Sequence, residues 1–493
     1  MDGKQDMTEL CSSPLYPIAN PRSIAVFGAS NNVMRMGTIM LTSMMSQGYE
    51  GKVYPVHPSE EHVLGLQAYP SVLDLPEVPD LALIILPTDI VCKTMDECGR
   101  KGIRHAIVVS GGFRESGSAG AAMQEELERI ADQYGIRFLG PNCLGVANLH
   151  LKLNPTPIAY EGPAGFVGLA SQSGSFVTQM HDYLYRMGLG FSTAFSVGNE
   201  ANIDIVDCME YLGACPHTKV IALYIEGIRR GKEFIEAARS IVPHKPIVAL
   251  YVGGSEAGRR AGLSHTGAIA GPDGVYDGMF RQCGIIRAQT ITELFDYCLA
   301  LGHLPRPLGN RAVIQTHSGG PGATAADSCG RAGLVLAELS KDTVEKLKPL
   351  IPHTASINNP VDITFSKNPM YDFYQIPDVL LADKNTDILM VYFISPHIFI
   401  QPMMERAGVS ADEAAEKSLA IIEKNCRAFV SLKEKYNKPI VAYTYRSLEE
   451  QMVRMLLDGG VPVYNDPDRA AYSLAAVLKY YGLTDRISAG DAG

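Results

Sequence analysis

The segment Ser23–Ser30, "SIAVFGAS", decides the fold class. Its short apolar run ends in Gly28-Ala29-Ser30, which predicts a strand buried on both faces that turns into a helix. The same pattern returns at 52–58 ("KVYPVHP"), 81–87 ("LALIILP") and 105–112 ("HAIVVSGG"), with a helical periodicity at 121–135. Continuous apolar strands that alternate with helices indicate an α/β fold, with a parallel sheet covered on both faces.

The pattern restarts twice, after Pro- and Gly-rich stretches at 150–163 and 302–311. At roughly 150 residues per domain, 493 residues also correspond to about three domains. We therefore predict three serial doubly wound domains. The predicted parts are an N-terminal extension (1–19), domains at 20–150, 160–302 and 310–483, and a disordered tail (484–493).

Composition excludes several classes of function. A net charge of -10 argues against nucleic acid as the main partner, because phosphate backbones need a basic face. The ten cysteines form no CxxC, so we expect no metal site and a reducing cytoplasmic setting. The longest apolar runs are strand-sized and the N-terminus is polar, so we expect neither a membrane span nor a signal peptide.

The turn at Gly28-Ala29-Ser30 has the form of a phosphate cradle, in which backbone N–H groups and a helix dipole face an anion. A nicotinamide site needs GxGxxG and an acid after the second strand. Here the next glycine is Gly37, and the second strand ends in Val56-His57-Pro58. A nucleotide attached differently, such as coenzyme A, and a turn without a ligand both remain open.

A further segment, "GLSHTGAIAG" (262–271), sets one histidine among small residues, with Arg259 and Arg260 just before it. Loops of small residues commonly carry function. By itself, the segment also fits a surface histidine in a glycine-rich loop.

Nine signatures, taken together, resemble the NDP-forming acyl-CoA synthetases, the superfamily of succinyl-CoA synthetase. Within it, the chain is most similar to the α subunits of ADP-forming acetate–CoA ligases. The signatures are "SIAVFGAS", "GKVYPVHP", "GPNCLGV" (140–146), "SQSGSF" (171–176), "VGNEANID" (197–204), "YIEGI" (224–228), "AGRRAGLSHTGAIAG" (257–271), "GGPGATAAD" (319–327) and "NNPVDI" (358–363).

The resemblance implies a Rossmann-like CoA-binding domain followed by two flavodoxin-like domains. It implies that His265 is phosphorylated during turnover and that Glu226 holds its second ring nitrogen. The alternative for Glu226, which we favour less, is a helix-start glutamate that caps the next segment. The substrates would be a small carboxylic acid, CoA and phosphate. ATP or ADP with Mg²⁺ would bind a separate ATP-grasp β subunit, in an αβ or α2β2 assembly.

The remaining expected site residues fall into three groups. The phosphoryl group is expected at the helix start formed by Ser171, Ser173, Gly174 and Ser175. The resemblance also implies that Asn142 and Cys143 lie at the phosphate- and acyl-binding site. Asn142 is expected to donate to the acyl carbonyl or phosphate, and Cys143 is expected to be a packed small residue there rather than a nucleophile. CoA is expected at Gly28, Ala29, Ser30, Pro55, Val56, Leu86, Pro87, Ser110 and Gly111.

One signature departs from the family. In "THSGGPG" (316–322), His317 and Ser318 stand where members usually show an asparagine and a small residue. His317 is either a second functional imidazole or, more plainly, a solvated turn histidine. Two other functions compete with the ligase hypothesis: a CoA-binding regulatory module without turnover, and a nicotinamide-dependent oxidoreductase.

Overall fold

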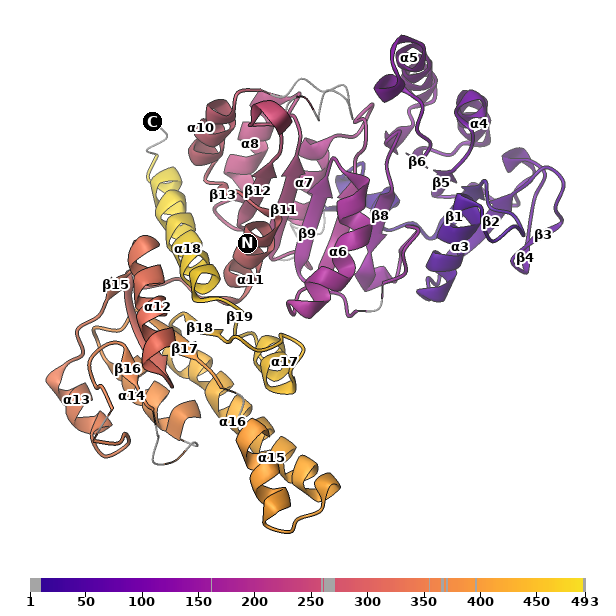
Figure 1. Cartoon of the computed structure of the whole chain (residues 1–493). Helices are drawn as coiled ribbons and strands as arrows, with labels where there is room; N and C mark the ends of the chain where they lie inside the picture. Colours follow the sequence, from indigo (N-terminus) through magenta and orange to yellow (C-terminus); the bar gives the residue numbers. More distant parts are fainter. Residues whose placement is uncertain are drawn as a thin grey trace. The chain divides into compact units, whose positions relative to one another are not determined.

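The chain is an α/β protein built on three mainly parallel sheets (Figure 1), which confirms the predicted fold class. The computed structural model describes residues 10–160, 162–258, 260, 271–353, 355–364, 368, 371–394 and 397–490. These form two compact units. The first comprises Met1–Tyr185, Leu189–Leu294 and Arg486–Gly493 and holds two sheets, and the second comprises Arg186–Gly188 and Phe295–Asp485.

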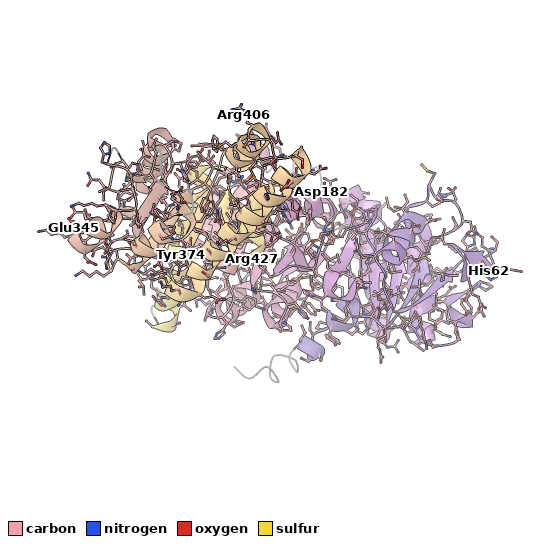
Figure 2. The ribbon with its side chains drawn as sticks, turned by 90° about the horizontal axis from the view of Figure 1, so that it is seen from below. His62, Asp182, Glu345, Tyr374, Arg406 and Arg427 are labelled. Carbon is pink, nitrogen blue, oxygen red and sulfur yellow. The ribbon has the colours of Figure 1, made fainter. Side chains whose placement is uncertain are left out.

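The first sheet has the order β2-β1-β5-β6-β7, and every neighbouring pair is parallel. Its strands are β1 (Ser23–Phe27), β2 (Lys52–Val56), β5 (Leu81–Ile84), β6 (His105–Val108) and β7 (Arg137–Leu139). The connecting helices are α3 (Met36–Ser46), α4 (Thr88–Lys101) and α5 (Ser118–Tyr134). A small hairpin of β3 (His62–Val63) and β4 (Leu66–Gln67) follows β2, and His62 is exposed there (Figure 2).

Alternation along β1 explains how this sheet is covered. Ala25 and Phe27 belong to one buried cluster with Val91 and Met95 of α4 and with side chains of α5. Ile24 and Val26 are also fully buried, on the opposite face, where the right-handed crossover rule places α3. Both faces of β1 are therefore buried, as the continuous apolar run predicts.

The second sheet has the order β13-β12-β11-β9-β10-β8. Its strands are β8 (Gly145–Asn148), β9 (Val167–Ser171), β10 (Phe191–Ser196), β11 (Val220–Ile225), β12 (Ile247–Tyr251) and β13 (Ile286–Ala288). Its helices include α6 (Gly174–Arg186), α7 (Ile205–Ala214), α8 (Gly231–Ile241) and α10 (Asp273–Cys283). All pairs are parallel except β8, which runs antiparallel to β10.

The two sheets of the first unit exchange segments. β8 comes from sequence expected in the first domain, yet it pairs with β10 of the second sheet. In return, the segment after β10 reaches β7, where the Ile203 amide donates to the Phe138 carbonyl at 3.2 Å. The N-terminal extension also joins the core, since Leu15, Ile18 and Ala19 are fully buried around the short helix α2 (Tyr16–Ala19).

The second unit holds a sheet of order β15-β14-β17-β18-β19, with β16 also paired to β14. The strands are β14 (Arg311–Thr316), β15 (Val335–Leu336), β16 (Val361–Asp362), β17 (Ile388–Tyr392), β18 (Ile440–Tyr443) and β19 (Val463–Tyr464). Among its helices are α12 (Gly319–Arg331), α13 (Lys341–Leu347), α15 (His397–Arg406), α16 (Ala411–Tyr436), α17 (Gln451–Asp458) and α18 (Pro467–Ser488).

Ion pairs on exposed helix surfaces occur in this unit, as at Arg427, which pairs with Glu423 along α16 at 2.6 Å (Figure 2).

The predicted disordered tail from residue 484 is wrong for its first residues. α18 continues to Ser488, and Thr484 within it is 8% exposed.

All three sheets share one strand order, 2-1-3-4-5, when the parallel strands of each are numbered in sequence and the short β16, which pairs beside β15 on β14, is left out. Doubly wound sheets bind ligands where the order reverses, outside the carboxyl ends of the first and third strands. The fold therefore offers three such crevices, between β1 and β5, between β9 and β11, and between β14 and β17. None of the helices in the described ranges is long and apolar enough to cross a membrane.

Candidate active site

The first crevice is formed by an unusually close turn after β1. Gly28 has φ +90°, and a Cβ on it would lie 1.9 Å from the carbonyl oxygen of Ile85 at the end of β5. A Cβ on Gly37, in the first turn of α3, would lie 2.4 Å from Gly28. Glycine at both positions lets the helix begin directly against the turn, so that its N-terminus faces the crevice.

Two side chains occupy amides of this turn. Thr38 Oγ1 accepts from the Ser30 amide at 3.0 Å, and the Glu60 carboxylate accepts from the Asn31 amide at 3.0 Å. The Asn31 side chain also donates to Glu60, at 2.5 Å. Glu60 comes from the loop after β2 and was missed by the sequence analysis, because nothing in its local pattern indicates that it returns to the turn.

The other expected CoA residues meet at the same edge. The Ser110 hydroxyl donates to the Leu86 carbonyl at 2.6 Å, which joins the ends of β6 and β5. The Thr88 hydroxyl donates to the Gly111 carbonyl at 2.6 Å, and the backbone amide of Asn142 donates to the Ser110 carbonyl at 2.8 Å. Pro55, Val56 and Pro87 lie at the carboxyl ends of β2 and β5, and Ala29 is buried in the turn. The structure thus groups the expected residues around one crevice; their contact with CoA stays a prediction.

The segment after β7 brings Asn142 and Cys143 to the boundary of the two sheets. Asn142 has φ +58°, and its side chain amide donates to Asn199 Oδ1 at 3.4 Å. Cys143 is 3% exposed, its thiol donates to the Val108 carbonyl, and burial raises the pKa of the thiol to about 12. Cys143 is therefore a packed small residue, as expected.

The second crevice contains the expected phosphoryl-binding turn between β9 and α6. The Ser171 hydroxyl donates to the Ser173 carbonyl at 2.7 Å and accepts from the Ser173 amide at 3.1 Å, which closes the turn. A Cβ on Gly174 would lie 2.9 Å from the Leu144 side chain, so glycine is required for this approach. Ser175 is exposed in the first turn of α6. Helix N–H groups and the helix dipole face outward here, which suits an anion.

Gln172, between those serines, links this turn to the end of β11. Its Oε1 accepts from the amides of Glu226, at 2.5 Å, and Gly227, at 3.0 Å. Its Nε2 donates to the Gly227 carbonyl at 2.6 Å and to Glu200 Oε2 at 2.8 Å. The sequence analysis missed this role, because it depends on two loops that are about fifty residues apart in the chain.

Glu226 follows β11 directly, so it lies at the carboxyl edge of the second sheet. The neighbouring strand β9 ends there at Ser171. Its backbone is held by Gln172, yet its Oε2 atom is buried with no hydrogen-bond partner among the described residues. A buried carboxylate oxygen is normally paired, so this atom is available to a donor.

His265 and Arg259 lie outside the residues that the structure describes. The two ends of their segment are nevertheless placed. The segment leaves the sheet at Tyr251. The Tyr251 hydroxyl donates to the Gly271 carbonyl at 2.8 Å, and its ring stacks on that of Tyr276, with the ring centroids 3.7 Å apart. Because β12 pairs with β11, both ends lie at the same edge as Glu226. Arg260 is exposed, with its guanidinium 3.9 Å from Glu256.

Comparison with known proteins identifies the family. Acetate–CoA ligase [ADP-forming] II subunit alpha of Pyrococcus furiosus is 39% identical over 471 residues, which cover 94% of this chain and 98% of that subunit. The chain belongs to the ADP-forming acetate–CoA ligase family. Acetate–CoA ligase [ADP-forming] I of Archaeoglobus fulgidus is 35% identical, and the match covers 93% of this chain and 63% of that relative.

Family models and a solved structure agree with this membership of the acetate–CoA ligase family. Residues 22–148 match a CoA binding domain, 164–301 a succinyl-CoA ligase like flavodoxin domain, and 312–463 a ligase-CoA domain. The dinucleotide forming acetyl-coenzyme A synthetase 1 of Ca. Korarchaeum cryptofilum, solved with phosphate and ADP, superposes with a TM-score of 0.85 at 31% identity. The match covers 97% of this chain and 98% of that one.

The third crevice of this ligase family member repeats the turn of the second. The Thr316 hydroxyl donates to the Ser318 carbonyl at 2.8 Å and accepts from the Ser318 amide at 3.2 Å, as Ser171 does with Ser173. His317 occupies the place of Gln172. Its side chain is 19% exposed, with Nε2 3.7 Å from Asp372, and burial lowers the pKa of the imidazole to about 4. The interpretation of His317 as a solvated turn histidine is therefore wrong.

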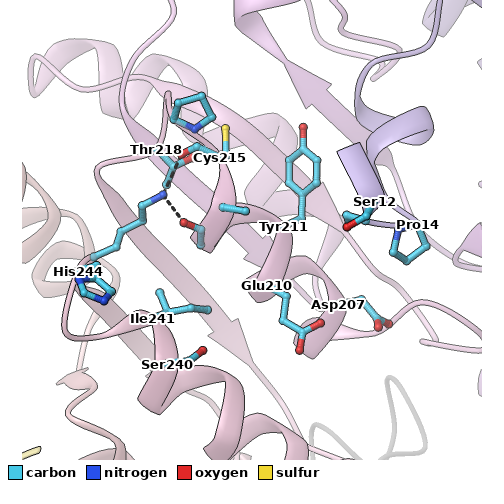
Figure 3. A pocket seen from close by; sticks show the side chains of 15 residues that line it. Ser12, Pro14, Asp207, Glu210, Tyr211, Cys215, Thr218, Ser240, Ile241 and His244 are labelled. Atoms are coloured by element: carbon cyan, nitrogen blue, oxygen red, sulfur yellow. Dashed lines mark hydrogen bonds between the residues drawn. The ribbon is translucent and has the colours of Figure 1, made fainter. Parts of the chain in front are cut away.

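A large cavity of about 840 Å³ lies away from these crevices (Figure 3). Glu210, Ile241 and His244 are among its lining residues, next to Lys245, whose ammonium donates to three carbonyls at the end of α7. The cavity follows α7 from Asp207 to the loop before β11 and reaches His244 and Lys245 before β12; neither Glu226 nor the turn of Ser171 and Ser173 is among its lining residues. In the described ranges, no three His, Cys, Asp or Glu side chains are grouped as metal ligands.

Proposed function

We propose that this chain is the α subunit of an ADP-forming acid–CoA ligase and carries the phosphoryl relay of that enzyme. One observation carries the proposal: Glu226 presents a buried, unpartnered carboxylate oxygen beside the N-terminal turn of α6. Family membership supports it, because the relatives of comparable length are named acetate–CoA ligase α subunits. Family membership does not support the nicotinamide-dependent alternative.

The reaction has three balanced steps. Phosphate attacks the acyl carbon of acyl-CoA, forming acyl phosphate and releasing CoA thiol. A nitrogen of His265 then attacks the phosphorus, which forms phosphohistidine and releases the carboxylic acid. ADP finally takes the phosphoryl group and becomes ATP. A neutral imidazole suits the second step, and the Glu226 carboxylate would accept a hydrogen bond from the N–H group of the other ring nitrogen.

The positions of the other residues in the fold support the further roles that we propose for them. The turn of Ser171, Ser173, Gly174 and Ser175 would hold the transferred phosphoryl group at the start of α6, where donors are fixed before reaction. Asn142 would bind the acyl carbonyl or phosphate, since it lies between the two sheets. CoA would occupy the crevice beside Gly28, with its thiol end towards Asn142.

We further propose a partner. The names of the relatives include "subunit alpha", and the Archaeoglobus ligase is longer than the match. A separate ATP-grasp β subunit would bind ATP or ADP with Mg²⁺, in an αβ or α2β2 assembly. A reducing cytoplasm is the setting we propose, and all ten cysteines are free thiols.

Phosphate transfer to the protein tests the relay. The chain is mixed with its nucleotide-binding partner, labelled ATP and Mg²⁺, and the label bound to the chain is measured. We expect an acid-labile, base-stable phosphate that His265→Ala abolishes while CoA binding, measured by calorimetry, is retained. Glu226→Gln should slow labelling about 10- to 100-fold, as is typical of residues that orient a reacting group.

Matched controls exist in the same chain. His353→Ala and Glu233→Gln alter an exposed histidine and an exposed glutamate outside the crevices, and both should label like the wild type. If His265→Ala labels as well as these controls, the relay assignment is wrong.

A further inference from the structure

Glu200 is a buried glutamate without a role in the reaction above. It lies in the loop between β10 and α7, with φ +52° and 8% exposure. We infer that Glu200 is a positioning residue, which holds Gln172 and, through Gln172, the backbone of Glu226. This inference rests on the proposed role of Glu226 in the relay.

The carboxyl group of Glu200 joins two elements. Its Oε2 accepts from Gln172 Nε2 at 2.8 Å, and its Oε1 accepts from the Ile205 amide, at the start of α7, at 3.0 Å. Arg229 fixes the backbone of the same loop, because its guanidinium donates to the carbonyls of Glu200 and Asn199 at 2.9 and 2.8 Å. Glu200 is thus a fixed acceptor rather than a mobile side chain.

Gln172 can take only one orientation in this arrangement. Its amide has two N–H donors and two acceptor lone pairs, and all four are used. A flipped amide would direct N–H groups at the amides of Glu226 and Gly227, and oxygen at the Glu200 carboxyl. Glu200, together with the backbone groups of Glu226 and Gly227, therefore holds the orientation in which Gln172 Oε1 accepts from the Glu226 amide.

This hydrogen bond matters because Oε2 of the Glu226 side chain has no hydrogen-bond partner among the described residues. The hydrogen bond from the Glu226 backbone amide to Gln172 fixes where the Glu226 side chain begins. A second set of residues that orients a reacting group typically changes activity about 10- to 100-fold when removed.

The protonation of Glu200 is consistent with the role. Burial, and then the nearby Asp204 carboxylate, raise the pKa of Glu200 to about 8, against the weaker opposing effects of the hydrogen bonds from Gln172 and Ile205 and of the Arg114 charge. A neutral carboxylic acid keeps acceptor oxygens for Gln172 and Ile205 without placing an unpaired charge in the interior.

Enzyme assays of the chain with its nucleotide-binding partner test the inference. Glu200→Leu removes the acceptor at similar size, and we expect kcat to fall 10- to 100-fold with the KM for CoA within about twofold. Glu200→Gln keeps one carbonyl oxygen for Gln172 and should stay within about threefold of wild-type kcat. Gln172→Leu should lose at least as much as Glu200→Leu, and the double variant no more than Gln172→Leu, because both act through one contact.

Asp383→Leu is the matched control for the loss of a buried acceptor. Asp383 is 3% exposed and accepts from the amides of Ser340 and Asn385 in the other compact unit. The Asp383→Leu variant should have a lower melting temperature than the wild type and an unchanged kcat. If Glu200→Leu does not fold, Glu200→Ala, alone and combined with Gln172→Met, measures the same coupling.

The outcomes separate this inference from the proposed function. If Glu226→Gln is inactive and Glu200→Leu has wild-type kcat, the positioning role is overturned and the relay stands. Additive losses in the double variant also overturn the positioning role. If Glu226→Gln is fully active, the proposed role of Glu226 fails, and with it the inference.

Discussion

At the scale of single residues, the buried carboxyl of Glu200 couples the stability of this ligase to pH. Its pKa rises from the ordinary 4.5 to about 8, first because burial penalises the charged form and then because of Asp204. Between these two values the folded chain holds a proton that the unfolded chain has lost. Its contribution to the free energy of unfolding is thus complete below pH 4.5 and is lost as pH rises through 8.

Glu200→Gln should remove this dependence. Relative to the wild type, we expect the variant to gain stability as pH rises from 5 to 9, by a few kcal/mol, since one pKa unit corresponds to about 1.4 kcal/mol. Urea unfolding of both proteins at pH 5, 7 and 9 measures the difference. A difference independent of pH would show that Glu200 is ionised in the folded chain.

Residue-level prediction succeeded where chemistry follows a strand–turn–helix pattern. The resemblance assigned Ser171, Ser173 and Glu226 to one reaction, and the structure brings them to adjacent strand ends. It could not find Gln172 or Glu200 as partners, because their contact joins loops that follow different strands. It also could not foresee that the side chain of His317 is only 19% exposed, since its neighbour Asp372 is distant in sequence.

At the scale of elements, α7 begins with a complete capping box next to the candidate site. Asp204 Oδ1 accepts from the amides of Val206, at 2.8 Å, and Asp207, at 3.3 Å, while Asp207 accepts from the Asp204 amide at 3.0 Å. Burial alone would raise the pKa of Asp204, but the Arg230 hydrogen bond and charge and the capped amides together lower it.

Asp204→Ala should therefore destabilise the chain by about 1–2 kcal/mol at pH 7 through loss of the cap. Because the pKa of Asp204 is lowered by folding, its contribution is present above the unfolded pKa of 3.8 and is lost as pH falls. Denaturant midpoints of Asp204→Ala and Asp204→Asn check this. Asparagine keeps the side chain acceptor, so Asp204→Asn should lose less; equal losses would contradict the cap.

Strands were predictable where apolar runs are continuous, as at β1, β5 and β11. The strand β8 was not, because "GVAN" is short, lacks such a run, and pairs with a strand more than forty residues away. The helix α18 was cut short in the prediction for a similar reason. Its last turn is polar and contains no signal that distinguishes it from a tail.

At the scale of the whole molecule, the antiparallel strand β8 belongs to the second sheet although it follows β7 of the first. We expect its amides to exchange with solvent as slowly as those of β10, because they share one hydrogen-bonded ladder. Native-state hydrogen exchange, read by mass spectrometry on peptides covering 137–139, 145–148 and 191–196, measures this. Exchange of β8 in step with β7 would contradict the shared ladder.

The exchange of segments between the two sheets has a consequence for recombining this ligase with its relatives. A graft of the CoA-binding part that runs past β8 would pair a foreign β8 with the native β10. A graft that replaces β7 without the loop at 197–204 would set the native Ile203 against a foreign residue at the position of Phe138. Functional chimaeras should therefore transfer that loop together with β7 and leave β8 with β10, although more than fifty residues separate β7 from the loop in the sequence.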